Sequence, residues 1–128
     1  MKQHVRTRAK FLCEYCRLPM GVLEEQFHIE HIRARHHGGP TTLENLALSC
    51  ARCNNHKGPN LAGVDPQDSQ AVLLFNPRLD SWSEHFKREG AMIHGTTPTG
   101  RATIAALCIN HPDRVILRSL LIELGELQ

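Results

Sequence analysis

The sequence predicts an α+β fold in which two short strands and a helix precede a second half of short strands and amphipathic helices. Three observations predict it. Residues 26–32 alternate apolar Phe27 and Ile29 with polar neighbours, which is the period of a strand. Two Cys-x-x-Cys pairs frame this region. Near the end of the chain, residues 111–125 place leucines at helical spacing.

The first half is predicted to form a hairpin followed by a helix. Residues 5–12 are expected to form a short helix, and strands are expected over 26–32 and 45–49. Between the strands, Thr41 and Glu44 have the spacing of a capping box, so a helical turn is expected to begin there. A further short helix over 51–58 is expected to end at its glycine.

The second half is predicted to supply supporting structure. Residues 60–66 are expected to form a turn that joins the halves, and residues 71–75 a buried strand. A short helix is expected over 81–90, ended by Gly90, and another strand over 91–95.

Two longer helices are predicted to complete the chain. Thr97 and Pro98 form a favourable N-cap and first-turn pair for a helix. Cys108 lies on the apolar face of that helix and is expected to be a buried core residue. The last helix is expected to bury one face, which carries Leu117, Leu120, Leu121 and Leu124.

Composition indicates an ordinary globular domain with an uneven charge. The chain has 128 residues, of which 41% are hydrophobic and 22% charged. Residues 1–64 contain nine Lys and Arg against five Asp and Glu, whereas residues 65–128 contain six against eight. This difference favours a polyanion-binding first half without deciding it. No apolar run approaches the roughly 20 residues of a membrane span, and the start lacks the apolar segment of a signal peptide. A cytoplasmic protein without a membrane partner is therefore expected.

The cysteines predict a structural zinc site. Cys13 and Cys16 form one Cys-x-x-Cys pair, and Cys50 and Cys53 form the other. Two such pairs suit one tetrahedral Zn²⁺, because each aims two thiolates at one point. The alternatives are two disulfides, which a reducing compartment disfavours, or four free thiols. A thioredoxin-like redox pair needs a βαβ unit, which the pattern does not predict.

The stretch between these pairs resembles the HNH nuclease motif, also called the ββα-metal fold. The residues that carry the resemblance are Glu30-His31, Gly38-Gly39, Asn45-Leu46 and Cys50-Ala-Arg-Cys53-Asn54. Cys13 and Cys16 match the subset of the family that zinc stabilises, and residues 59–128 resemble the tail of small stand-alone bacterial members. The resemblance implies one domain over 1–128, with a zinc-pinned catalytic core over 13–58 and a supporting extension over 65–128.

By this resemblance the protein is a metal-dependent endonuclease that hydrolyses DNA phosphodiester bonds. His31 is the implied general base, and Asn45 the residue that holds its ring. Glu30 and Asn54 are the implied oxygen ligands of one Mg²⁺ or Mn²⁺, and the products would carry 5′-phosphate and 3′-hydroxyl ends. His28 shares the face of Glu30 on a strand, so it is a candidate third ligand, with a structural histidine as the alternative.

Two positions depart from the family pattern. The acid before the histidine is usually Asp but is Glu30 here, and many members have His where this chain has Asn54. An amide oxygen is a harder ligand than imidazole, so this substitution favours Mg²⁺ or Mn²⁺ over Zn²⁺ or Ni²⁺.

Basic residues around this segment are candidate contacts to DNA phosphates. They are Arg33, Arg35, His36, His37, Arg52 and Lys57. Each taken singly also fits an ordinary solvated surface. No element for reading bases is visible, so low sequence specificity, or specificity supplied by a protein partner, is expected. A zinc-stabilised nucleic-acid-binding module without catalysis is the alternative function, and a structural zinc domain is a weaker one. Biological role, nicking or double-strand cleavage, and oligomeric state stay open.

Overall fold

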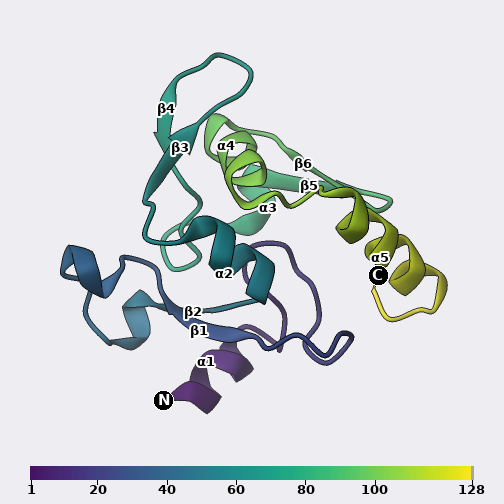
Figure 1. Cartoon of the computed structure of the whole chain (residues 1–128), viewed down its shortest axis with the longest axis horizontal. Helices are drawn as coiled ribbons and strands as arrows, with labels where there is room; N and C mark the ends of the chain where they lie inside the picture. Colours follow the sequence, from purple (N-terminus) through teal and green to yellow (C-terminus); the bar gives the residue numbers. More distant parts are fainter. Residues whose placement is uncertain (128) are drawn as a thin grey trace.

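The computed structural model describes residues 1–127 and has the α+β architecture that the sequence predicts (Figure 1). Strands β1 (His28–His31) and β2 (Leu46–Ser49) pair antiparallel, and helix α2 (Ala51–Lys57) follows directly. The hairpin–helix prediction is thus confirmed. The other elements are α1 (Lys2–Arg8), η1 (Arg35–His37), η2 (Leu43–Asn45), β3 (Ala62–Val64), β4 (Ala71–Leu73), α3 (Trp82–His85), β5 (Phe86–Glu89), β6 (Met92–Gly95), α4 (Pro98–Leu107) and α5 (Pro112–Glu123).

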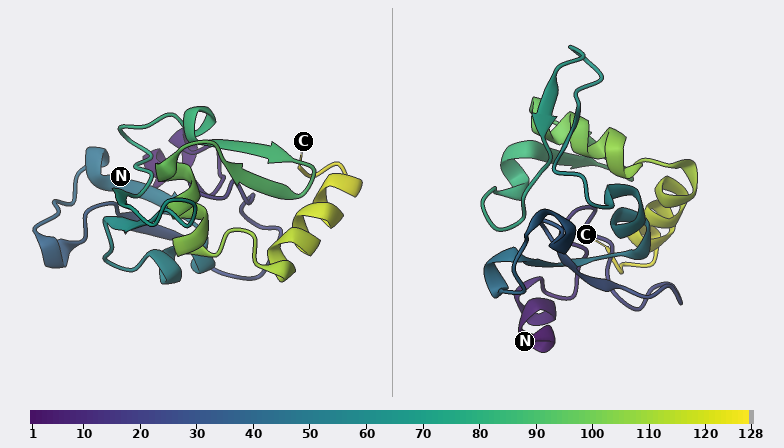
Figure 2. Two further views of the ribbon diagram at one scale, coloured as in Figure 1. Left: turned by 90° about the horizontal axis from the view of Figure 1, so that it is seen from above. Right: turned by 60° about the vertical axis from the view of Figure 1, so that its left-hand side comes forward.

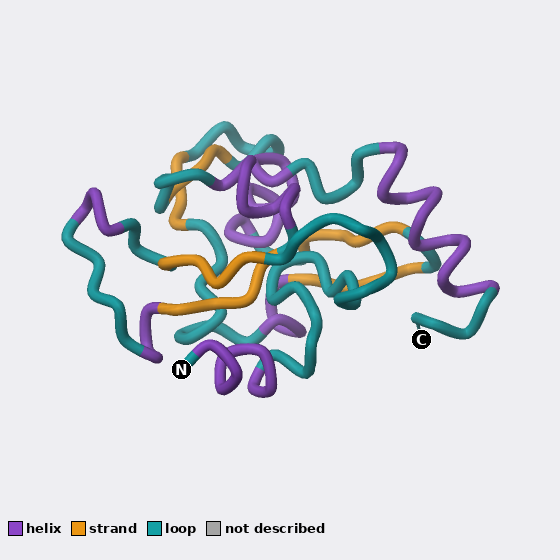
Figure 3. Tube along the Cα trace, turned by 60° about the horizontal axis from the view of Figure 1, so that its bottom comes forward, coloured by secondary structure: helices purple, strands orange, loops and turns teal. Residues whose placement is uncertain are grey.

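Local chemistry explains the hairpin–helix unit. The Cys50 thiol accepts a hydrogen bond from the Cys53 amide at 3.4 Å and so caps α2, and Gly58 ends the helix with a positive φ of 52°. On one side of the hairpin, α1 buries Val5 and Ala9 against residues of β2. The long β1–β2 connection, with the short turns η1 and η2, projects at the opposite end of the molecule from α5 (Figure 3).

The main core joins the two halves of the chain. Helix α4 packs against α2, β3 and β6, and the β5–β6 hairpin lies beside it (Figure 2). Trp82 donates its indole N–H to the carbonyl of Tyr15 at 2.8 Å, while the Arg17 guanidinium lies over the same ring, 5.0 Å from its centroid. The buried members of this core are Cys13, Tyr15, Cys16, Leu18, Cys50, Cys53, Leu74, Phe75, Phe86, Ile93, Ala102, Leu107, Ile109 and Leu121.

Four predicted elements differ from the structure. The first helix begins and ends earlier than predicted, because the chain turns after Arg8. Residues 62–64, predicted as part of a turn, form β3 and pair with β4. The strand predicted as buried over 71–75 is β4, which ends at Leu73 and has exposed end residues. The predicted helix over 81–90 stops at His85 and continues as β5, and Gly90 lies in the β5–β6 turn with a φ of +58°.

Three side-chain predictions also require correction. Thr41 and Glu44 form no capping box, because Thr42 precedes η2 and its side chain makes no capping bond. Cys108 is not buried in the core but lies half-exposed in a left-handed position after α4, φ +51°. Of the four leucines predicted on the buried face of α5, Leu121 is buried and Leu117 partly buried, but Leu120 and, just past the helix, Leu124 are exposed. The helix also buries Arg114 and Arg118. By contrast, the predicted Thr97 cap of α4 is present, with its hydroxyl accepting from the Gly100 amide.

Candidate active site

The four paired cysteines converge on one point. The sulfur atoms of Cys13, Cys16, Cys50 and Cys53 lie within 4.8 Å of one another, and all four residues are buried. Burial raises the pKa of the Cys13 thiol well above its ordinary value, so a charged thiolate there needs a cation beside it. Four converging, buried sulfur donors are the ligand set of a structural zinc ion, and this group fits one.

A cleft opens beside the zinc-binding group, where the end of β1 meets the end of α2. Its volume is about 480 Å³. Glu30 and His31 line it from β1, Asn54 from α2 and Arg35 from the long connection. The predicted acid, base and amide ligand are therefore brought together, along with one predicted phosphate contact. His28 is on the strand face of Glu30 but is not among the residues that line this cleft, so the structure does not unite it with the other three.

Glu30 is a buried carboxylate with two polar neighbours. Its side chain is only 5% exposed. The hydroxyl of Tyr15 donates to one carboxylate oxygen, and the Lys57 ammonium lies 3.9 Å from the other. Burial raises the pKa of Glu30 to about 7, although both neighbours act in the opposite direction. Glu30 is thus held at an energetic cost with its carboxyl at the wall of the cleft.

His31 is oriented by a residue that the sequence did not suggest. Its ring Nε2 shares a 2.8 Å hydrogen bond with the hydroxyl of Thr41. Asn45 was predicted to hold this ring, but within residues 1–127 it forms no hydrogen bond to His31. Its amide instead bonds the amide N–H and carbonyl of Arg33 and the carbonyl of Pro40, at 2.8–3.0 Å. Asn45 therefore holds the two ends of the long connection together.

The predicted phosphate contacts divide into two groups. Arg33, Arg35, His36 and His37 are exposed on the connection, and of these Arg35 reaches the cleft. Lys57 contradicts its prediction, because it is 2% exposed and donates to the carbonyl of Ile32 at 2.9 Å.

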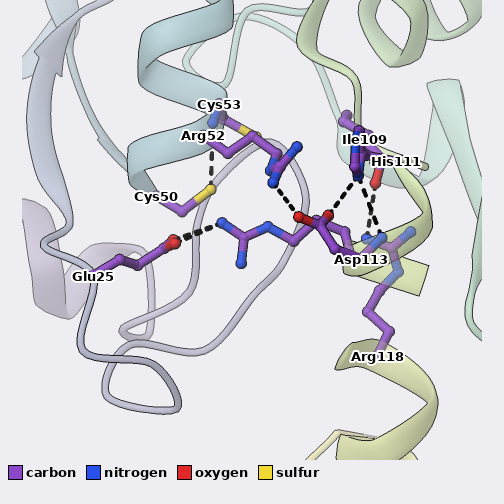
Figure 4. Close-up of polar contacts among 9 residues, drawn as sticks. Glu25, Cys50, Arg52, Cys53, Ile109, His111, Asp113 and Arg118 are labelled. Carbon is purple, nitrogen blue, oxygen red and sulfur yellow. Dashed lines mark hydrogen bonds and ion pairs between the residues drawn. The ribbon is translucent and has the colours of Figure 1, made fainter. Parts of the chain in front are cut away.

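Arg52 is also placed away from the cleft. Its guanidinium forms a 2.5 Å ion pair with Asp113 at the start of α5 (Figure 4). The same close-up shows Arg118 of α5 donating to the Ile109 carbonyl, a distance of 3.1 Å. Arg52 therefore joins α2 to the C-terminal helix rather than extending the cleft.

Comparison with known protein families matches residues 13–60 to the HNH endonucleases. The match runs from the first zinc-binding cysteine through the hairpin and α2. This segment is thus similar to the HNH endonucleases. The HNH assignment agrees with the geometry, because the acid, the histidine and the helix asparagine of the motif line a single cleft.

One curated relative extends the similarity beyond the HNH segment. The chain is 28% identical over 112 residues to the Septu protein PtuB of Bacillus thuringiensis. This alignment covers 86% of this chain and 41% of the relative. The chain thus spans about two fifths of that relative's length. No solved structure matches the chain significantly. Within residues 1–127, no helix is long and apolar enough to cross a membrane.

The cleft also contains oxygen donors of the kind that hold a hard divalent cation. Glu30 supplies a carboxylate and Asn54 an amide oxygen, which are donors that Mg²⁺ and Mn²⁺ accept together with water. Each oxygen of Glu30 has one polar neighbour and can accept a further bond.

Two residues of this HNH site escaped the sequence analysis. Tyr15 lies inside the first cysteine pair, so zinc binding and support of Glu30 depend on the same turn. The only signal for Tyr15 was that it is the one tyrosine of the chain. Thr41 matched a capping pattern, and that local explanation concealed its contact with His31.

Proposed function

We propose that this protein is a metal-dependent endonuclease that hydrolyses phosphodiester bonds of DNA. The observation that carries the proposal is the single cleft shared by Glu30, His31 and Asn54. We further propose that residues 1–128 act as one domain, with a catalytic core over 13–58 and a supporting extension over 65–128.

His31 is the proposed general base. A neutral imidazole nitrogen takes a proton from water while the water oxygen bonds to phosphorus. The bond from phosphorus to the 3′ oxygen breaks, and that oxygen leaves as a hydroxyl after gaining a proton, so the 5′ end keeps the phosphate. The Thr41 hydroxyl holds the ring.

Glu30 and Asn54 are the proposed ligands of the catalytic ion. Tyr15 and Lys57 fix the Glu30 carboxylate from behind, so its position does not depend on the ion. Mg²⁺ or Mn²⁺, when bound, would stabilise negative charge on the phosphate and the leaving oxygen.

Exposed basic residues on the β1–β2 connection are the proposed contacts to the DNA backbone. Arg35 lines the cleft, whereas Arg33, His36 and His37 lie on the same connection without lining it. Such contacts position a duplex without reading its sequence. We therefore propose that sequence preference is low or comes from a protein partner.

A plasmid-nicking assay with Mg²⁺ or Mn²⁺ tests the proposal. We expect nicking by the natural protein and at least a 100-fold loss in His31→Ala, because a general base contributes about 10²–10⁴-fold. His94→Ala is the matched control, since His94 is exposed on β6 away from the cleft. Zinc content and circular dichroism confirm folding. DNA binding without nicking by the natural protein would instead favour a non-catalytic binding module.

A further inference from the structure

A second cavity adjoins the HNH cleft and has no role in the proposed reaction. Its volume is also about 480 Å³. Ile32 and Arg33 line it, directly following the cleft residues Glu30 and His31, and Asn60 and Leu61 line it directly after Gly58 and Pro59 of the cleft. The two hollows therefore share the same two chain segments as their border.

The walls of this cavity are largely apolar. Phe75 lies at its base, 3% exposed. Two leucines that line it are strongly exposed to solvent, Leu73 at 70% and Leu79 at 83%. Exposed apolar side chains around a concave surface are typical of a ligand site, because covering them releases water from apolar surface.

Polar groups in the cavity remain free to bind a ligand. Within the described part of the chain, the side-chain amide of Asn60 has no hydrogen-bond partner, and neither does the Asp80 carboxylate oxygen that does not accept from the Asn76 amide. His85 uses its Nδ1 for Thr97 at 2.6 Å, which leaves Nε2 available. An amide, a carboxylate and an imidazole can satisfy the amino groups and ring nitrogens of a nucleobase.

Charge decides which part of a nucleotide suits this cavity. Lys57 also lines the cavity, but its buried ammonium already donates to the Ile32 carbonyl and pairs with Glu30. The Asp80 carboxylate therefore disfavours the sugar-phosphate backbone inside. Arg33 lies at the border nearest the exposed connection, where a phosphate would be attracted. This arrangement suits a nucleotide whose flat, uncharged and partly polar base lies inside the cavity while its phosphate lies outside.

We propose that this cavity binds an unstacked nucleobase of the DNA strand whose phosphate lies in the cleft. The preferred substrate then carries an unpaired nucleotide beside the cleaved bond, because a paired base must first leave its stack at an energetic cost. This inference rests on the proposed function for its choice of ligand.

Binding measured without cleavage tests the inference. His31→Ala protein is titrated, at constant salt and without divalent ion, into a fluorescein-labelled duplex and into the same duplex with a one-nucleotide bulge. We expect at least tenfold tighter binding to the bulged duplex. A 2-aminopurine placed in the bulge is expected to change its fluorescence on binding, since its stacking environment changes.

Exposed leucines provide variants that keep the fold. In the same background, Leu79→Ser and Leu73→Ser are expected to remove most of the preference for the bulge. Leu120→Ser is the matched control, because Leu120 is 50% exposed on α5, outside both hollows. Its preference for the bulge is expected to equal that of the parent.

Two results would overturn the inference. One is equal affinity for the paired and bulged duplexes. The other is an unchanged preference in both leucine variants, which would favour an apolar segment of a protein partner as the occupant. Because no step of this experiment requires cleavage, a natural protein that fails to nick DNA but prefers the bulge would refute only the nuclease proposal.

Discussion

At the residue scale, the cleft is distinguished by a carboxylate that is buried at a cost. Glu30 is held by Tyr15 and Lys57, yet burial still raises its pKa to about 7. Structural carboxylates usually have a lowered pKa, since the surrounding bonds favour the charged form. A raised pKa in a cleft is a property of catalytic and ligand sites, where stability is given up for chemistry.

The variant Glu30→Gln is expected to gain stability relative to the natural protein as pH rises. Between pH 4.5 and about 7 the folded protein keeps a proton on Glu30 that the unfolded chain has lost, so the natural protein loses stability as pH rises through this window. The variant lacks this loss, which amounts to roughly 3 kcal/mol at most. Thermal melts of both proteins at pH 5 and pH 8, without added divalent ion, measure the change.

The exposed Glu44 of the same connection provides the control for this comparison. Glu44→Gln is expected to follow the natural protein at both pH values. A constant difference in melting temperature between Glu30→Gln and the natural protein would show that the Glu30 carboxyl titrates as it does in water. Nicking activity is expected to be lost in Glu30→Gln and kept in Glu44→Gln.

Thr41 is expected to set the ring orientation of His31. If Nε2 donates to the threonine hydroxyl, Nδ1 keeps the lone pair that receives the proton from water. Thr41→Val removes this bond and is expected to lower kcat about fivefold, since one hydrogen bond contributes about 1 kcal/mol. KM should change little. Steady-state cleavage kinetics measure both constants.

Conservative and neighbouring variants separate orientation from general disturbance. Thr41→Ser keeps the hydroxyl and is expected to restore most of the rate. Thr42→Val alters an equally exposed threonine whose side chain makes no capping bond, and its rate should be unchanged. A Thr41→Val enzyme as fast as the natural one would refute the role of this hydroxyl.

At the element scale, sequence patterns correctly predicted the elements whose conformation depends on residues close together in the sequence. The β1–β2 hairpin, α2 and the Thr97 cap were predicted because alternation, cysteine spacing and capping act over a few residues. The strand β5 was missed because its pairing with β6, rather than its own propensity, determines its conformation. Tyr15 and Thr41 were likewise missed as site residues, because the side chains they contact lie ten or more positions away in the sequence.

The C-terminal helix shows the limit of periodicity most clearly. Its leucine pattern predicted an apolar inner face, but Arg114 and Arg118 are buried and Leu120 is exposed. These arginines bond to groups that no local pattern indicates: Glu25 for Arg114, and backbone carbonyls for Arg118. The polar partners of these arginines, together with burial of Leu121, therefore determine which face of α5 points inward.

Two ion pairs join α5 to the first half of the chain, and they are expected to differ in strength. Arg114 binds both oxygens of Glu25 at 2.7 and 2.8 Å and is almost fully buried, whereas Asp113 of the Arg52 pair is 55% exposed. Arg114→Met is expected to cost about 3 kcal/mol of unfolding free energy, because Glu25 loses its partner. Arg52→Met should cost less than about 1 kcal/mol.

Urea unfolding of the natural protein and both variants measures these costs. The Arg52→Met variant is itself the matched control, since it removes a guanidinium of the same size from the same interface between α5 and the first half. Equal costs for the two variants would show that burial of the Arg114 pair does not determine the attachment of α5.

At the scale of the whole molecule, the zinc-binding cysteines belong to the main core. Cys13, Cys16, Cys50 and Cys53 share one buried cluster with residues of β5, β6, α4 and α5. A separate zinc knuckle could unfold locally, but this arrangement makes the ligands part of the contact between both halves. Tyr15 extends the dependence to the cleft, because the turn that carries two ligands also carries the donor to Glu30.

Removal of zinc is therefore expected to unfold the entire chain rather than one loop. Structural zinc contributes about 10–16 kcal/mol in small domains, which equals or exceeds the usual 5–15 kcal/mol stability of a domain. One zinc per chain should be released by a chelator, with simultaneous loss of helical circular dichroism and of the Trp82 environment seen by fluorescence. Cys13→Ser should behave as the chelated protein does.

The variant Cys108→Ser is the matched control, since Cys108 lies outside the cluster. This variant should keep its zinc and its fold. Zinc release that leaves the β5–β6 hairpin and α4 protected in hydrogen exchange would instead show two independently folding halves.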